Sequence, residues 1–309
     1  MSLFSRIASF LRNPARTRRR LHCIQQVTVT LPEKMNSEFL WLVCPLPAAT
    51  STQEIDGAPV YTVPPTELKT DPTYGNRYAT WRLSGAPGSS ITITGTHTVI
   101  VRPTHLTLSA YDTTVFNEST DSIYLQNTAH LSSGDARIQE VANAISRREP
   151  TVAERVRACN EYVKSRLTYG APIPGLYSAT QALELPAVDC GGYATLLVSL
   201  LIACGIPARI VSGFWLDGGK NTMHAWAEAQ VAPGVWLPLD PSVESLRHAG
   251  RSKKIAAPGE IGSDRLRLSV GCDITVTAGE TAYVTDILQC PEVYPRETGA
   301  TVTHHIRIS

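Results

Sequence analysis

The sequence predicts an α+β protein in which a strand-rich first third precedes a helical segment and a second set of strands. Between Leu21 and Tyr111, stretches such as "CIQQVTVTL" and "ITITGTHTVIVRP" alternate apolar and polar residues and are rich in Thr, Val and Ile, as half-buried strands require. From "DARIQEVANAISRR" onward, the apolar residues recur at helical spacing instead. Strands collected before helices are typical of α+β proteins.

The strand-rich part is expected to form a small β-sandwich over residues 21–118. "FLWLVCPLP" and "YATWRL" supply further short strands, and the segments between them carry Pro, Gly, Asp and Asn, which favour turns. Several short strands separated by turn clusters are typical of a sandwich.

The helices are expected in a second region, residues 119–262, where each has its own start signal. "TVAERVRACNEYVKSRL" opens with Thr151 and Glu154, a capping box in which each residue satisfies a backbone donor of the other. "YSATQALEL" predicts a short helix that Ser178 caps.

A fourth helix is predicted from about Cys190 to Cys204, with apolar residues along one face. Asp189 is placed to cap its start, and Gly205, followed by Pro207, is placed to end it. Cys204 lies among apolar residues and is expected in the core, whereas Cys190 lies in the first turn, between an aspartate and two glycines.

Strands return after this helix. "ARIVSGFW", "HAWAEAQV" and "VWLPLD" read as three strands, and Pro233-Gly234 suits a tight turn between the last two. Residues 263–309 contain "LRLSV" and "TVTHHIRIS", which are expected to complete either this region or the sandwich. The segment "LRHAGRSKKIAAPGEIGSDR", around residues 247–265, is a candidate mobile loop over the site.

Composition excludes several classes of protein. A net charge of +1 and the lack of a dense basic face argue against nucleic-acid binding, and no apolar run reaches the 18 residues of a membrane span. The seven cysteines are scattered, odd in number and without a CxxC pair, which favours a reducing, cytoplasmic compartment over a disulfide framework. The histidines show no zinc spacing, so neither a metal nor another cofactor is expected.

Residues 1–20 are expected to be a basic tail. Leu3, Phe4, Ile7 and Leu11 follow helical spacing among arginines, so this tail could touch a membrane surface, although a frayed terminus is the favoured reading.

Cys190 is the candidate nucleophile because of its place at a helix start. The amide groups and dipole there favour an anion, and therefore the reactive thiolate. Gly191 and Gly192 leave the sulfur uncrowded, so that a substrate can approach it closely. A cysteine placed only for packing gains nothing from this position.

A nucleophile needs a base, and the base needs an orienting group. His224 opens the strand "HAWAEAQV", whose alternation puts His224, Trp226 and Glu228 on one face and three alanines on the other. The alanine face suits packing against a helix, so the histidine face is expected to line a cleft beside Trp226. Asp240 ends the adjacent strand, where its carboxylate could accept a hydrogen bond from the imidazole.

Three motifs, "DCGGYATLLVSLLIACGIPARIVSGF", "MHAWAEAQV" and "GVWLPLDPS", occur in this order within residues 151–242. They closely resemble those of the transglutaminase-like superfamily, a branch of the papain-like cysteine enzymes. The strand-rich first part resembles, more loosely, the β-domain that precedes this core in bacterial and archaeal members. The resemblance implies a core in which a helix carrying the cysteine packs on an antiparallel sheet carrying the histidine and aspartate.

By the same resemblance, Cys190 matches the nucleophile, His224 the general base and Asp240 the orienting acid. Many members carry glycine where this chain has Val188, so the flexibility of that loop is expected to differ. The Cys190 backbone N–H is expected in the oxyanion hole, and Tyr177 and Gln181 are the sequence neighbours considered for its second donor.

The resemblance implies acyl transfer through a thioester, with a peptide or protein amide as the substrate class and hydrolysis favoured over cross-linking. Trp226, Gly191 and Tyr169 are the expected substrate-binding residues. The alternative is a catalytically silent module of the same fold that binds a peptide or protein, because fold alone does not imply activity.

Overall fold

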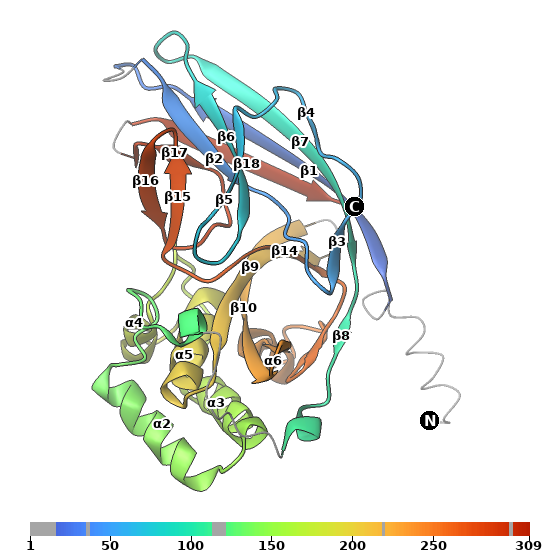
Figure 1. Cartoon of the computed structure of the whole chain (residues 1–309), viewed down its shortest axis with the longest axis vertical. Helices are drawn as coiled ribbons and strands as arrows, with labels where there is room; N and C mark the ends of the chain where they lie inside the picture. The colour runs from blue at the N-terminus through green and yellow to red at the C-terminus, as the bar shows by residue number, and fades with distance from the viewer. Residues whose placement is uncertain (1–16, 35–37, 113–121, 218–219, 297–298) are drawn as a thin grey trace.

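The computed structural model describes residues 17–34, 38–112, 122–217, 220–296 and 299–309. Two regions lie one above the other in Figure 1, a β-sandwich at the top and a helix-covered sheet below it. The mixed architecture of many antiparallel strands and few helices confirms the predicted α+β class.

The sandwich consists of two antiparallel sheets packed face to face. One has the order β18-β1-β7-β3, with β4 also paired to β7, and the other has the order β17-β2-β6-β5. A buried apolar cluster that includes Val27, Leu42, Trp81 and Ile93 fills the space between them. The strands are β1 (Arg19–Thr30), β2 (Leu40–Pro45), β3 (Gln53–Ile55), β4 (Val60–Tyr61), β5 (Glu67–Thr70), β6 (Arg77–Leu83), β7 (Ser90–Val101), β17 (Glu292–Tyr294) and β18 (Thr301–Ile308).

Strands from both ends of the chain build this sandwich. β18 pairs with β1 from Cys23↔Ile308 to Thr30↔Thr301, and β17 pairs with β2. The C-terminal residues therefore join the sandwich, and Figure 1 shows the C-terminus at its lower edge. β1 begins at Arg19, so the last two residues of the expected basic tail belong to a strand, whereas residues 1–16 lie outside the described residues.

The helical region begins with α2 (Ala136–Arg148), α3 (Val152–Arg166) and α4 (Ala179–Glu184). Both predicted caps form as expected. In α3, Glu154 N donates to Thr151 Oγ1 at 3.2 Å and Thr151 N donates to Glu154 Oε2 at 3.0 Å. In α4, Ser178 caps the first turn through Gln181 N, also at 3.2 Å. These helices begin where their sequences predict because each cap satisfies amides that the helix leaves free.

α5 (Cys190–Ala203) lies at the centre of this region. All residues from Gly191 to Ile202 are buried, so the helix has apolar contacts on every side and not along one face only. A helix that is hydrophobic all round belongs in a core, and its apolar neighbours come from α2, α3, α4 and the sheet. Gly205, at φ +76°, ends the helix as predicted, and Cys204 is buried.

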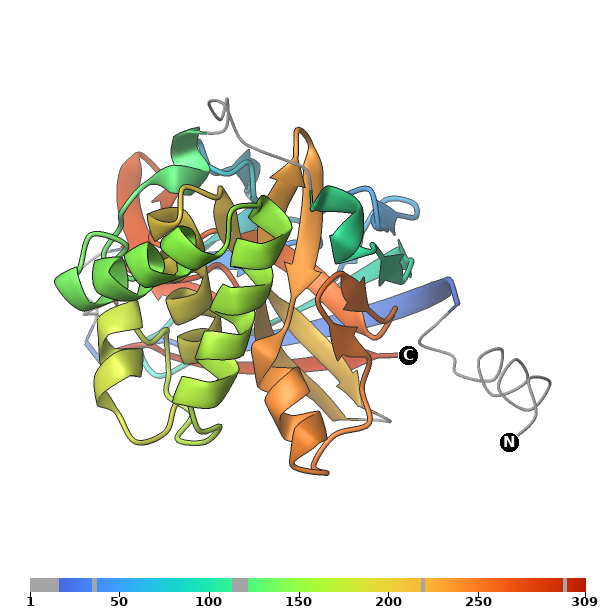
Figure 2. The same cartoon turned by 90° about the horizontal axis from the view of Figure 1, so that it is seen from below.

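One antiparallel sheet lies against α5, in the order β11-β10-β9-β14. Ala225, Ala227 and Ala229 of β10 pack into the cluster that contains α5, as the alternation predicts. Figure 2, seen from below, shows the helices in front of this sheet. The strands are β9 (Ala208–Asp217), β10 (Lys220–Ala232), β11 (Val235–Leu239) and β14 (Arg265–Val270).

Short elements complete the molecule. They are the 3-10 helices η2 (Leu108–Tyr111) and η3 (Ser122–Leu125), helix α6 (Pro241–His248), and strands β8 (Thr104–His105), β12 (Ala256–Ala257), β13 (Glu260–Ile261), β15 (Ile274–Ala278) and β16 (Thr281–Thr285). β12, β13 and β8 form a small sheet, and β15 pairs with β16.

An apolar cluster joins the two regions. Leu21 and Val99 from the sandwich pack with Phe214 from β9 and Leu266 from β14. Because this contact is buried and apolar, the sandwich and the helical region share part of one core.

Candidate active site

Cys190 is the first residue of α5. The Asp189 carboxylate caps the helix by accepting from Gly191 N at 2.9 Å and Gly192 N at 3.3 Å. The sulfur is placed where the helix dipole favours an anion, and the residue is only partly buried. The cap fixes the backbone of this turn and hence the direction of the thiol.

The two glycines are required by close packing. A Cβ on Gly191 would lie 2.8 Å from Leu176 Cδ1, and one on Gly192 would lie 2.7 Å from Val188 Cβ. Val188, the departure from the family pattern, is fully buried and fills the space that Gly192 leaves open. The loop before Cys190 is therefore held by packing against the helix start.

His224 connects Cys190 with Asp240. Its Nε2 lies 2.8 Å from Asp240 Oδ2, and its imidazole and the Cys190 thiol line the same cavity and interact electrostatically. Because Nε2 is engaged by the carboxylate, Nδ1 is left for the sulfur. Burial alone would lower the pKa of His224, but Asp240 and, to a smaller extent, Cys190 raise it to about 9.

Asp240 has four hydrogen-bond partners. Besides His224, Oδ2 accepts from Arg265 Nη2 at 2.7 Å, and Oδ1 accepts from Ser242 Oγ at 2.9 Å and from Val243 N at 3.2 Å. The last contact makes Asp240 the N-cap of α6. Burial opposes its charge, yet His224 and Arg265 hold the pKa of the carboxyl well below its usual range.

Two further contacts hold the imidazole in place. The Trp215 ring lies 4.8 Å from the His224 ring, centroid to centroid. Gln289 Nε2 donates to the His224 backbone carbonyl at 3.0 Å and to the Gly213 carbonyl at 2.7 Å. Gln289 lies between β16 and β17, so the sandwich side of the molecule holds the backbone of the candidate base.

A cavity of about 590 Å³ lies next to these groups. Cys190, His224 and the expected substrate contacts Tyr169 and Gly191 all line it. Burial, followed by the nearby Cys190, raises the pKa of Tyr169. Its other walls come from the loop before α4 and from the segment around β16 and β17, and they include Ile173, Leu176, Met223, Thr285, Asp286, Ile287, Cys290, Glu292 and Arg296.

Trp226 corrects the expectation that the histidine face of β10 lines a cleft over its whole length. Its side chain is 2% exposed, packs with Val211, Ile261 and Val270 and does not line the cavity, although its ring stacks on the His224 ring with the centroids 6.1 Å apart. The face that carries Trp226 and Glu228 lies beneath other strands, and only the first residues of β10 reach the cavity. Strand alternation gives the face of a residue but not what covers that face.

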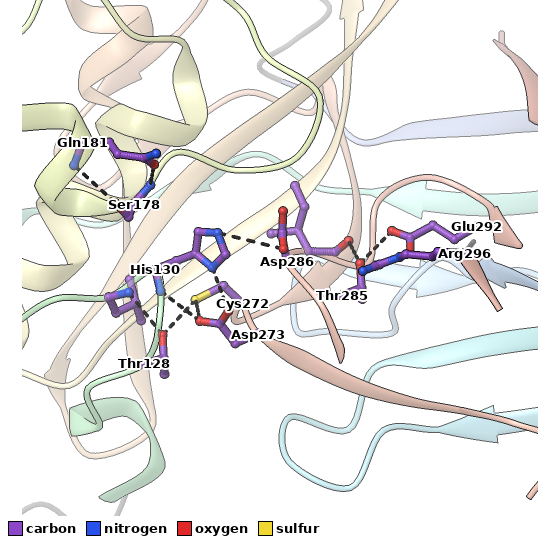
Figure 3. Close-up of polar contacts among 12 residues, drawn as sticks. Thr128, His130, Ser178, Gln181, Cys272, Asp273, Thr285, Asp286, Glu292 and Arg296 are labelled. Atoms are coloured by element: carbon purple, nitrogen blue, oxygen red, sulfur yellow. Dashed lines mark hydrogen bonds and ion pairs between the residues drawn. The ribbon is translucent and has the colours of Figure 1, made fainter. Parts of the chain in front are cut away.

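Neither sequence neighbour considered for the second oxyanion donor lies at the cavity. Figure 3 shows the Gln181 side chain beside Ser178, where its Oε1 accepts from Ser178 N at 2.9 Å. The Tyr177 hydroxyl donates to the Ala171 carbonyl at 2.7 Å. Both groups stabilise local structure instead.

The segment 247–265 does not line this cavity. Its residues 256–261 form β12 and β13, and Ile255 and Ala256 are buried. The segment lies beside α6, where Arg247 Nη1 donates to the Ala256 carbonyl at 2.7 Å. The expectation of a loop over the site is therefore wrong, because paired strands and buried apolar residues fix this segment outside the cavity, although its last residue, Arg265, reaches Asp240.

A second polar cluster supports the far wall of the cavity. His130 Nδ1 lies 2.7 Å from Asp273 Oδ1, and its Nε2 lies 4.0 Å from Asp286 Oδ1 (Figure 3). The hydrogen bond to Asp273 raises the pKa of His130 although burial opposes it. Cys272 also borders this cluster, where burial raises its pKa. We assign the cluster to the wall and not to the reacting groups.

Arg265 and Gln289 are the functional candidates that sequence reasoning missed. Arg265 directly precedes the "LRLSV" strand segment, as the last residue of "LRHAGRSKKIAAPGEIGSDR", and is buried in the structure. Nothing in the sequence indicates that its partner is Asp240, 25 positions earlier. Gln289 gives no signal at all, because its contacts are to backbone carbonyls.

Within the part of the chain that the structure describes, no group of three or more His, Cys, Asp or Glu side chains could hold a metal ion. Among the same residues, no helix has both the length and the apolar character needed to cross a membrane.

Comparison with known proteins places this site in a family. Residues 139–241 match the model of the transglutaminase-like superfamily. A search of curated proteins finds no match. A candidate cysteine protease from Cytophaga hutchinsonii, of known structure, is 17% identical with a TM-score of 0.66, and the alignment covers 94% of this chain and 90% of that one.

The periplasmic domain of TgpA from Pseudomonas aeruginosa is 15% identical with a TM-score of 0.38, over 80% of this chain and 94% of that one. At these identities the first structure shows a shared fold, and the second carries no further argument. The family match covers Cys190, His224 and Asp240. Residues 139–241 therefore match the transglutaminase-like superfamily, and in this chain they are joined to a β-sandwich built from both ends of the sequence.

Proposed function

We propose that the protein is a cysteine-dependent hydrolase or acyltransferase that acts on an amide of a peptide or protein. The observation that carries the proposal is the grouping of Cys190, His224 and Asp240 beside a cavity, with His224 hydrogen-bonded to Asp240 and interacting with the Cys190 thiol. A nucleophile, a base and an orienting group in this order are what thiol acyl transfer needs.

In the first step His224 takes the thiol proton on Nδ1 as the sulfur attacks the carbonyl carbon. The new S–C bond places negative charge on the carbonyl oxygen. When this intermediate collapses, the C–N bond breaks and the imidazolium gives its proton to the departing nitrogen. The amine leaves, and the acyl group stays on Cys190 as a thioester. Asp240 stabilises the imidazolium during this step because it is ionised and 2.8 Å away.

In the second step a water molecule attacks the thioester and His224 takes one of its protons. The C–S bond breaks, the sulfur recovers the proton, and a carboxylic acid leaves. An amine in place of water would give a transferred acyl group by the same sequence of bonds. We favour hydrolysis, with water as the acceptor of the acyl group.

The oxyanion needs donors beside the sulfur. Asp189 engages the amides of Gly191 and Gly192, and we assign the first helical amide, that of Cys190, to the developing oxyanion.

The lining of the cavity supports a peptide as the substrate class. Ile173, Leu176, Met223 and Ile287 offer apolar contacts, whereas Asp286, Glu292 and Arg296 add charges to the lining. A cavity with mainly apolar walls and a few fixed polar groups suits a side chain and the backbone next to it.

The test compares two thiols of the same cavity. Iodoacetamide alkylation, resolved by site with mass spectrometry, is followed against pH for the native protein and His224→Ala. Cys190 is expected to react rapidly well below pH ~8.5, the reference for a free thiol, and to lose this reactivity in the variant. Cys290 is the internal control, since burial and Glu292 raise its pKa to about 11.

Turnover is then measured with p-nitrophenyl acetate, a general acyl donor, for the native protein, Cys190→Ala and Cys190→Ser. Both variants are expected to retain the fold and lose at least 10³-fold in rate, on the scale of other nucleophile deletions. Substantial turnover by either variant would refute the proposal. If Cys190 reacts no faster than Cys290 over the whole pH range, the peptide-binding module becomes the better description.

A further inference from the structure

Two cations share one oxygen of Asp240. Arg265 Nη2 lies 2.7 Å and His224 Nε2 lies 2.8 Å from Oδ2. Asp240 and His224 are 1% exposed and Arg265 is 3% exposed, so water screens none of these contacts effectively. A charge-assisted hydrogen bond in such surroundings is stronger than one at the surface.

The carboxylate cannot rotate away from this arrangement. Its other oxygen, Oδ1, accepts from Ser242 Oγ and Val243 N, so four donors surround the group. A protonated carboxyl would lose at least one of these acceptor positions, which favours the ionised form.

Arg265 is itself fixed in position. Its Nη1 donates to Asp264 Oδ1 at 3.0 Å, and its Nη2 also donates to the Ile255 carbonyl at 3.3 Å. Arg265 is the cross-strand neighbour of Trp215, whose ring lies 5.9 Å from the guanidinium carbon and 4.8 Å from the His224 ring. Trp215 therefore contacts the histidine and lies near the arginine.

The Arg265 guanidinium affects the pKa of His224 because both groups are hydrogen-bonded to the same Asp240 carboxylate. A carboxylate whose only cationic partner was His224 would stabilise the imidazolium fully, whereas one that is also bonded to Arg265 stabilises it less. The other charged or titratable groups near these three are Cys190 on α5, Tyr169 before α4, Glu244 on α6, and Asp264 with its partner Lys254.

We propose that Arg265 is a positioning residue of this site: it keeps Asp240 ionised and aimed at His224, and it limits how basic His224 becomes. This inference rests on the proposed function, because a limit on the basicity of His224 matters only if His224 transfers protons. An imidazolium that held its proton too strongly would give it up slowly to the departing amine, and it would be a poor base for the attacking water.

The experiment measures the pKa of the His224 ring by NMR, with ¹⁵N-labelled histidine, in the Cys190→Ala protein, where no thiol contributes. Arg265→Gln removes the charge and is expected to raise the pKa of His224 by about one unit, because a nearby like charge has been lost. Arg265→Lys keeps the charge and is expected to leave the pKa within a few tenths of a unit of the parent protein.

Arg267 supplies the matched control. It lies two residues further along β14, is 7% exposed and forms a buried ion pair with Glu228. Arg267→Gln removes the same charge from the same strand at comparable cost to the fold and is expected to leave the pKa of His224 unchanged. An unchanged pKa in Arg265→Gln, or an equal rise in both glutamine variants, would overturn the proposal.

The result of this titration can be distinguished from the result of the tests of the proposed function. The NMR titration needs neither a substrate nor the thiol, so it can support the role of Arg265 even if Cys190 proves to be inert. Conversely, normal alkylation and turnover at Cys190 with no shift in Arg265→Gln would leave the function standing and remove this inference. If Arg265→Gln does not fold, Arg265→Met and the lysine variant are titrated instead, and the same comparison decides.

Discussion

Two buried histidines show how differently the two regions treat a titratable group. His224 in the helical region is 1% exposed, and His97 in the sandwich is 6% exposed. His224 is bonded to Asp240, and its pKa is raised to about 9. Burial, with a smaller effect from Arg77, lowers the pKa of His97 to about 4.

The difference lies in the partners and not in the burial. His97 lies 5.6 Å from the Tyr61 ring, and among the described residues its Nε2 has no hydrogen-bond partner. Burial without an anion disfavours the imidazolium, whereas an adjacent carboxylate outweighs the same burial. The buried histidine that carries a charge, His224, therefore lies in the region where we propose chemistry. The neutral one, His97, lies in the sandwich, for which no chemistry is proposed.

The two histidines affect stability at opposite ends of the pH range. A free histidine titrates near pH 6.5. The stabilising contribution of His224 is therefore fully present below about pH 6.5 and is lost as the pH rises through about 9. His97 behaves in the opposite way: the unfolded chain binds the proton first, so stability falls as the pH decreases from about 6.5 to about 4.

The largest expected effect comes from removing the carboxylate that keeps His224 charged. Asp240→Asn removes the anion that stabilises the His224 imidazolium, and p-nitrophenyl acetate turnover is expected to fall about 10³- to 10⁴-fold, as in other triads. The pKa of His224, followed by NMR, should fall below its native value. A loss of less than tenfold would mean that His224 is activated by other groups.

Removing β18 tests whether the two regions are one cooperative unit. Deletion of residues 301–309 takes away the partner of β1 and removes the partly buried Ile306 and Ile308 from the shared apolar cluster, which should cost several kcal/mol of unfolding free energy. Because the shared apolar cluster joins the regions, tryptophan fluorescence and the exposure of Cys159 to alkylation should report the same denaturant midpoint. Two separate midpoints would show that the regions unfold independently.

Replacing His97 should remove the acid sensitivity of the sandwich. The gap between a pKa of about 4 and one of about 6.5 corresponds to about 2 kcal/mol of unfolding free energy at pH 5 and about 3 kcal/mol at pH 4. We expect His97→Phe to lose less stability than the native protein between pH 7.5 and pH 5, as measured by urea denaturation. His22→Phe, at an exposed position on β1, is the control and should follow the native curve.

The smallest expected effect on turnover comes from replacing Gln289, which connects the segment before β17 with the backbone of His224. Gln289→Leu removes both bonds to the Gly213 and His224 carbonyls, and we expect about a tenfold loss of turnover with a stability cost of about 2 kcal/mol. Gln53→Leu is the matched control, since the Gln53 side chain bonds the Ala48 and Arg267 carbonyls away from His224. Equal turnover losses in the two variants would show a general effect of destabilisation.

The sequence by itself determined the local structure and the order of the reacting residues. The caps at Thr151, Ser178 and Asp189 form as predicted because a cap depends on residues within three positions of one another. The strand and helix periods are also local, so the sandwich strands and the helix that begins at Cys190 could be placed. The motifs around Cys190, His224 and Asp240 indicated the family.

Only the tertiary structure decided what surrounds those residues. It buries Trp226, which alternation had assigned to the cleft, and it brings Arg265 to Asp240 and Gln289 to the His224 backbone. It also returns β17 and β18 to the sandwich and forms one wall of the cavity from the chain beside them. These contacts join positions 25 to about 280 residues apart, and they depend on which sheet faces pack together, which no local pattern encodes.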